Sequence, residues 1–103
     1  MNRAILTDDS GRWFDIDKAT RFDEDTEWNG NNHISCATRS QWDHERLYRT
    51  AGGRWIVYHW SQWQGSTPHY TEISETNAAK WLSINDHEPP AVIAEHFAAL
   101  EIA

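Results

Sequence analysis

The segment Arg54–Gly65, RWIVYHWSQWQG, holds three of the chain's seven tryptophans within nine positions, and it constrains the fold more than any other segment. In a β-strand, successive side chains point to opposite faces of the sheet. A strand here places Trp55, Val57, His59, Ser61 and Trp63 on one face and Ile56, Tyr58, Trp60 and Gln62 on the other. Neither face is simply polar. The pattern therefore predicts a strand that is covered on both sides, or one that leaves an aromatic face open for a partner.

The length of the chain limits it to one domain. A chain of 103 residues suffices for one two-layer hydrophobic core and is too short for a second. Only 39% of the residues are hydrophobic, but many of these are aromatic. Tryptophan and tyrosine bury large areas while keeping one polar group. We therefore expect a single domain over residues 1–103.

Turn sequences divide the N-terminal half into short segments. Ala4–Thr7 and Trp13–Ile16 lie on either side of the turn sequence Asp8–Gly11, which predicts a hairpin, or one strand followed by an irregular arm. Asp17–Asn32 is polar and ends in a strong turn signal, NGNN. A strand pattern resumes at Ile34–Thr38.

The centre of the chain predicts an antiparallel meander. Glu45–Thr50 and Arg54–Trp63 flank Ala51-Gly52-Gly53, whose glycines can adopt positive φ, and this is the clearest hairpin. Gly65–Pro68 interrupts the pattern, and His69–Ile73 supplies another short strand.

The hydrophobic period changes to that of a helix at Ser74, a good N-cap residue. One helical face then carries Ala78, Trp81, Leu82 and Asn85. A final helix is expected at about Pro90–Glu101, with an apolar stripe of Ile93, Phe97 and Leu100. We therefore predict an α+β fold, in which an antiparallel sheet of about five short strands is followed by two C-terminal helices packed on one face.

The net charge of −7 argues against binding to a nucleic-acid backbone, which requires clustered Lys and Arg, and it favours a protein partner with a basic surface. Acidic residues are concentrated in the N-terminal third. The group of Asp23, Glu24, Asp25 and Glu27 is either a solvated loop or an acidic docking surface.

Cys36 is the single cysteine, so no intrachain disulfide can form and a reducing compartment is expected. The N-terminus lacks an apolar run of signal-peptide length, and no stretch is long enough to span a membrane. We expect a cytoplasmic protein without a membrane partner.

Motifs of known chemistry are missing from the sequence. There is no HxxxH or HxH pair, no CxxC, no GxSxG elbow and no glycine-rich phosphate loop. No catalytic residue, metal site or cofactor is therefore predicted. One alternative stays open: His33, His44 and His59 could converge on the sheet beside Asn31 and Asn32, as in a small enzyme or a ligand-binding protein.

The end of the aromatic strand is a better candidate for a binding site than the histidine and asparagine cluster. Gln62, Trp63 and Gln64 combine a flat apolar ring with amides that can orient a ligand or a protein partner. Trp63 adjoins a polar, glycine-ended segment, which favours exposure.

Several segments together resemble a group of small bacterial proteins for which no activity is established. These segments are NGNNHIS, WDHERLYRT, GRWIVYHWSQWQGS, Tyr70–Ile73 and AAKWLSIN, and they cover a little over half of the chain. The resemblance implies a compact bacterial domain and no mechanism. In size, acidity and aromatic content the chain is also similar to small acidic proteins of phages and mobile elements, including anti-CRISPR proteins.

The sequence thus favours a small acidic, non-enzymatic binding or regulatory protein that acts through protein–protein contact, such as an inhibitor from a phage or mobile element. A homodimer formed through an exposed edge of the aromatic sheet is a further alternative, since unpaired strand edges are natural pairing templates.

Overall fold

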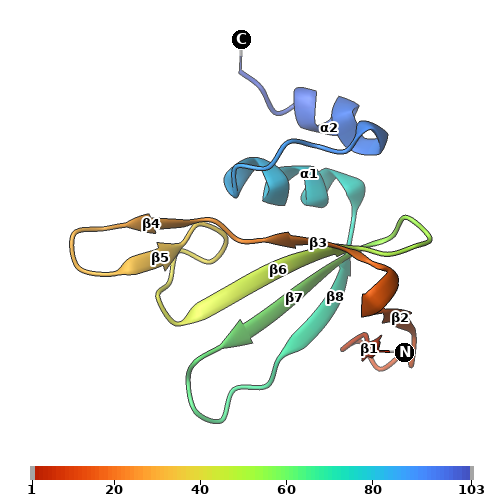
Figure 1. Ribbon diagram of the computed structural model, residues 1–103, viewed down its shortest axis with the longest axis horizontal. Helices are drawn as coiled ribbons and strands as arrows, with labels where there is room; N and C mark the ends of the chain where they lie inside the picture. Colours follow the sequence, from red (N-terminus) through yellow and green to blue (C-terminus); the bar gives the residue numbers. More distant parts are fainter. Residues whose placement is uncertain (1, 103) are drawn as a thin grey trace.

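The computed structural model describes residues 2–102, which form a central antiparallel sheet with small elements around it (Figure 1). The sheet has four strands in the order β3-β6-β7-β8, namely β3 (Thr20–Asp23), β6 (Asp43–Arg49), β7 (Trp55–Ser61) and β8 (His69–Ile73). Two separate hairpins are formed by β1 (Arg3–Ile5) with β2 (Trp13–Asp15), and by β4 (Thr26–Trp28) with β5 (His33–Ser35). The helical elements are η1 (Ile16–Lys18), α1 (Glu75–Ile84), η2 (Ala91–Ile93) and α2 (Ala94–Ala98), where η1 and η2 are 3-10 turns.

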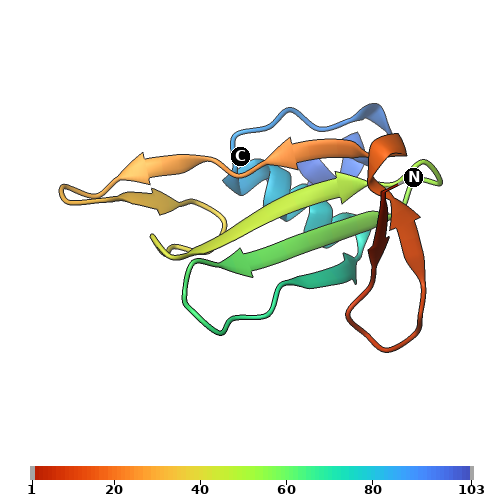
Figure 2. The same ribbon diagram turned by 60° about the horizontal axis from the view of Figure 1, so that its bottom comes forward.

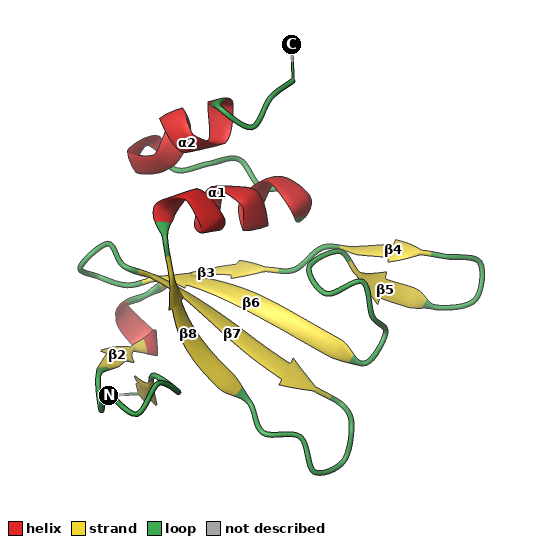
Figure 3. Cartoon of the chain, turned by 180° about the vertical axis from the view of Figure 1, so that it is seen from behind, coloured by secondary structure: helices red, strands yellow, loops and turns green. Residues whose placement is uncertain are grey.

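The helices α1 and α2 lie on one face of the sheet, as Figure 3 shows, and the predicted α+β class is confirmed. Ser74 caps α1 as expected, because its side chain accepts a hydrogen bond from the Asn77 amide. The core on this face contains Leu47 and Trp55 from the sheet together with Ala78, Ala79, Trp81, Leu82 and Ile93 from the helical segment. The predicted helical face of α1 is therefore the buried one.

The opposite face of the sheet is covered at one end only. A second core cluster joins Ala4, Leu6 and Phe14 of the N-terminal hairpin to Tyr48 and Ile56 of the sheet. The rings of Tyr58 and Tyr70 pack against this cluster, with centroids 4.5 Å apart. The aromatic strand β7 is thus covered on both sides near Trp55, whereas the side chains towards Ser61 are half-buried.

The N-terminal hairpin also contacts the outer strand of the sheet. The Thr7 amide donates to the Tyr70 carbonyl at 2.8 Å, and the Tyr70 amide donates to the Thr7 hydroxyl at 2.8 Å. Both backbone polar groups of Tyr70 are therefore bonded to this hairpin.

Figure 2 shows the β4–β5 hairpin as an arm that extends from the sheet at the end opposite the β1–β2 hairpin. We call Thr26–Ser35 the arm. The sequence did not predict β3 or β4, since both fall in the polar segment 17–32. The strand expected at Ile34–Thr38 ends at Ser35 instead, because the chain turns there and the Arg39 amide donates to the Ser35 carbonyl at 2.8 Å.

The last helix is shorter than the predicted Pro90–Glu101. A 3-10 turn precedes it, and α2 ends at Ala98. Ile93 is nevertheless buried, and Phe97 and Leu100 pack against the core as their spacing indicated. Within residues 2–102, no helix is long and apolar enough to cross a membrane.

Candidate functional site

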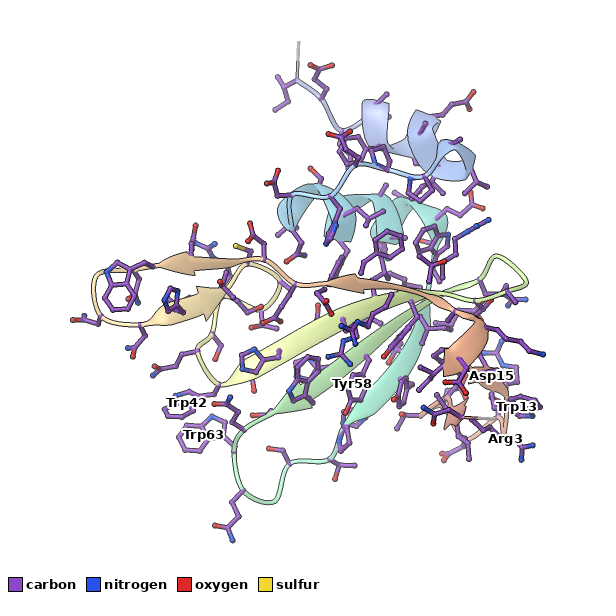
Figure 4. All side chains as sticks on the ribbon, in the orientation of Figure 1. Arg3, Trp13, Asp15, Trp42, Tyr58 and Trp63 are labelled. Atoms are coloured by element: carbon purple, nitrogen blue, oxygen red, sulfur yellow. The ribbon has the colours of Figure 1, made fainter. Side chains whose placement is uncertain are left out.

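Two tryptophans from different segments meet at one end of the central sheet. Trp42 precedes β6 and Trp63 follows β7, where the register pairs Asp43 with Ser61. The backbone continues this pairing, because the Gln62 amide donates to the Trp42 carbonyl at 2.9 Å. The two indole rings lie with their centroids 5.0 Å apart and their planes tilted by 45° (Figure 4). Aromatic pairs favour this range of separations.

Both rings nevertheless remain open to solvent. Trp63 is 60% exposed and Trp42 is 40% exposed, and Gln62 and Gln64 are exposed beside them. We call Trp42, Gln62, Trp63 and Gln64 the tryptophan-pair surface. Because β7 ends at Ser61, strand alternation does not set the direction of Trp63. Its contact with Trp42 holds the ring at the surface.

A small recess lies between Trp42 of this surface and the turn of the arm. Its volume is about 280 Å³, and its lining includes Asn29, Asn32, Arg39 and Trp42. The Asn29 side chain accepts hydrogen bonds from the amides of Asn31 and Asn32 at 2.9 and 2.8 Å. Asn29 therefore shapes the turn of the arm, Asn31 is exposed there, and Asn32 borders the recess next to Trp42.

The three histidines of the alternative hypothesis do not converge. Glu45 pairs with His59 across β6 and β7, so their side chains share one face of the sheet, and His44 points to the other face. The His44 ring lies 5.4 Å from the ring of Trp60 on that second face. His33 is exposed on the arm, with its ring 5.2 Å from that of Trp28. The enzyme or ligand-site alternative required one pocket, and these side chains occupy three separate places.

Glu24 has a structural position that its sequence context did not indicate. Its side chain is only 11% exposed and lies where β3 leads into the arm. One carboxylate oxygen accepts hydrogen bonds from the Ser35 hydroxyl at 2.8 Å and from the Glu45 amide at 2.6 Å. The other lies 2.7 Å from Nδ1 of His44. Glu24 therefore connects the arm to the sheet.

The other acidic residues of the predicted docking group are on the surface, and two of them are paired. Asp23 lies within 3.2 Å of both Arg21 and Arg46. Glu27 pairs with Arg39 at 2.7 Å, and both side chains are more than half exposed. Asp25 is exposed, and its carboxylate accepts the Thr26 amide at 2.9 Å. The acidic group is thus spread over the edge of the sheet and the arm.

Cys36 is a buried thiol at the end of the arm. Burial raises its pKa, and the nearby carboxylates of Asp25 and Glu27 act in the same direction. A raised pKa reduces the thiolate fraction that a nucleophile needs. Across residues 2–102, no group of three or more His, Cys, Asp or Glu side chains is placed to hold a metal ion.

No protein-family model matches the sequence, and neither a curated protein nor a solved structure shows a significant match to it. The resemblance to small bacterial proteins therefore stays a prediction, and the function has to be argued from the side chains themselves.

Proposed function

We propose that the protein is a non-enzymatic binding module that holds a protein partner at the tryptophan-pair surface and thereby regulates or inhibits that partner. One observation carries the proposal: Trp42 and Trp63 pack against each other at 5.0 Å while both stay exposed. Tryptophan is enriched among the residues that supply most of the binding energy at interfaces.

The contact between the two rings favours a fixed arrangement of this surface before a partner binds. A partner that binds it would not have to immobilise two free indole side chains, and ordering a side chain at an interface costs about 0.5–1.5 kcal/mol. Gln62 and Gln64 add donors and acceptors at the margin of the rings. The recess lined by Asn29 and Asn32 next to Trp42 extends the surface with a concave polar part.

The charge of the chain supports a partner with a basic surface. The net charge is −7, and complementary charge accelerates encounter more than it strengthens the final complex. In this proposal the net negative charge of the chain attracts the partner, and the tryptophan-pair surface holds it. Of the exposed acidic residues Asp23, Asp25 and Glu27, Asp25 contributes most, because arginines pair with the other two. Glu24 takes no part in this attraction, because it is mostly buried.

The test is affinity purification from cells of the source organism with the full chain tagged at its C-terminus. Trp63→Ala is compared with Trp28→Ala, because Trp28 is 59% exposed but lies on the arm beside His33. A protein that the wild type and Trp28→Ala retain should bind Trp63→Ala about tenfold more weakly or worse, as expected for a binding hot spot.

The rates at which the identified protein associates with the purified chain and dissociates from it are then measured at increasing salt concentration. Association should slow as salt rises, because screening shortens the range of the attraction. Charge reversal at Asp25 and Glu27 should slow association further, with little change in dissociation. Equal retention by wild type, Trp63→Ala and Trp42→Ala would contradict the tryptophan-pair surface, whatever the salt dependence.

A further inference from the structure

A cavity lies at the end of the sheet opposite the tryptophan-pair surface. Its volume is about 450 Å³, and it opens between the N-terminal hairpin and the turn that joins β6 to β7. Small-molecule sites in proteins typically have volumes of about 300–1,000 Å³. The cavity therefore has the size of a ligand site, and the proposed function makes no use of it.

One side of the cavity is apolar. Leu6, Phe14 and Ile56 line it and belong to the core cluster beneath the hairpin. Trp13 adds an indole ring that is 46% exposed. The guanidinium of Arg3, which is not part of the lining, lies 4.3 Å from the centroid of this ring, and Figure 4 shows both residues at the same end of the molecule. This contact favours a fixed position of the indole at the rim of the cavity, on the face of the hairpin opposite Phe14.

The other side of the cavity carries charge. Three cationic side chains, Arg12, Lys18 and Arg54, line it together with the carboxylates of Asp15 and Glu72. Both carboxylates already have partners. Glu72 accepts hydrogen bonds from Arg12 at 2.8 Å and from Nε of Arg54, and Asp15 accepts the Asp17 amide at 3.0 Å.

The cations are engaged to different degrees. Arg12 is the most engaged, since each of its three nitrogens makes a hydrogen bond, to Ser10, Glu72 and Asp8. Arg54 uses Nε for Glu72, which leaves its two terminal nitrogens without a hydrogen bond to any residue from 2 to 102. Lys18 makes no ion pair within the same range. Unused donors therefore face the cavity, while its carboxylates are occupied.

We propose that this cavity binds a small aromatic anion, whose ring lies against the apolar side and whose carboxylate or phosphate group is held by Lys18 and Arg54. The apolar side favours a ligand with a ring over an inorganic ion. The cationic donors favour an anionic ligand over a neutral aromatic compound, because hydrogen bonds to charged groups are the stronger ones.

The test is nuclear magnetic resonance titration of the full ¹⁵N-labelled chain with four probes. Phenylacetate and phenyl phosphate have both a ring and an anion, benzyl alcohol has the ring alone, and acetate has the anion alone. The Trp13 indole N–H and the Gly52 amide lie in the lining and report on binding. At least one of the two aromatic anions should give saturable shifts there, and the one that binds more tightly identifies the anionic group.

Substitutions of the two cationic residues test whether they hold the anionic group of the ligand. Lys18→Gln and Arg54→Gln should each weaken binding of the aromatic anion by about tenfold, the loss expected for one charge-assisted hydrogen bond. Lys80→Gln is the matched control, because Lys80 is the chain's other lysine and is exposed on α1. Lys18 is exposed as well, so its replacement leaves the fold intact.

The proposal is overturned if neither aromatic anion gives saturable shifts, if benzyl alcohol binds as tightly as the anions, or if both cavity variants bind like Lys80→Gln. A Trp42→Ala/Trp63→Ala chain should bind the anion as the wild type does. The test of this ligand site is therefore independent of the test of the protein-binding surface.

Discussion

Glu24 and His44, which are 20 positions apart in the chain, meet at 2.7 Å where β3 leads into the arm. The same carboxylate accepts hydrogen bonds from the Ser35 hydroxyl and the Glu45 amide. Three segments are thereby held together by one side chain, and the orientation of the arm depends on it.

Replacement of this carboxylate should destabilise the fold. Glu24→Ala leaves several donors without their acceptor in a mostly buried place, which costs about 1–3 kcal/mol for each such group. Glu27→Ala is the control, since it breaks a surface pair with Arg39, and such pairs contribute about 1 kcal/mol or less. Urea denaturation of both variants measures the difference. Equal losses would show that Glu24 is no more important than a surface carboxylate.

The two rings of the tryptophan-pair surface should stabilise each other. A double-mutant cycle with Trp42→Ala and Trp63→Ala is expected to give a coupling free energy of about 0.5–1.5 kcal/mol, the range for aromatic pairs. The near-ultraviolet circular dichroism of the pair should disappear in either single variant. Additive losses would mean that the rings are neighbours without an interaction.

The two glycines in the turn between β6 and β7 should differ in their tolerance of a side chain. Gly53 has a φ of +85°, and its amide donates to the Thr50 carbonyl at 2.9 Å. Gly53→Ala should cost about 1–2 kcal/mol, because an L-residue is disfavoured in this conformation. At Gly52 an added Cβ would meet only the Thr50 hydroxyl at 3.9 Å. Gly52→Ala should therefore change the melting temperature much less than Gly53→Ala, and the reverse order would contradict the geometry of the turn.

Acid should weaken the fold partly through Glu72. Hydrogen bonds from Arg54 and then Arg12 lower the pKa of Glu72 below its ordinary value of 4.5. Since the folded pKa is the lower one, the stabilisation is present above the unfolded pKa and is lost as the pH falls through the folded pKa. Glu72→Gln should therefore be less stable than the wild type at neutral pH and lose less stability below about pH 4.5.

The measurement is the free energy of unfolding between neutral and acidic pH. Arg54→Gln removes the first partner of Glu72 and should weaken the acid dependence in the same direction. If the stability of Glu72→Gln falls with acid as steeply as that of the wild type, other groups cause the acid dependence. Asp8 is one other source, because hydrogen bonds from Ser10 and Arg12 lower its pKa to about 2.

The sequence predicts the parts of the fold that local chemistry determines. The β6–β7 hairpin follows from two alternating segments around Ala51-Gly52-Gly53, and the start of α1 follows from Ser74. By contrast, β3 contains a single apolar residue, Phe22, and β4 has no buried residue at all. Their strand conformation comes from pairing with partners, and hydrophobic alternation cannot show it.

The sequence predicts one member of the tryptophan pair. The polar neighbours of Trp63 indicate exposure, whereas no local pattern points to Trp42. Counting outward from the turn, the register pairs Arg49 with Trp55 and Asp43 with Ser61, which brings Trp42 next to the segment that contains Trp63. The same count places His44 and His59 on opposite faces. The register of the hairpin, followed outward from its turn, therefore predicts both the proximity of Trp42 to Trp63 and the separation of His44 from His59.

The contact between Thr7 and Tyr70 bears on how copies of this chain meet one another. Both backbone groups of Tyr70 are already bonded to the N-terminal hairpin, so another chain cannot prolong the sheet at Tyr70 without first displacing that hairpin. Unprotected strand edges seed amyloid-like growth. The N-terminal hairpin thus blocks edge-to-edge pairing with another chain at Tyr70 of β8.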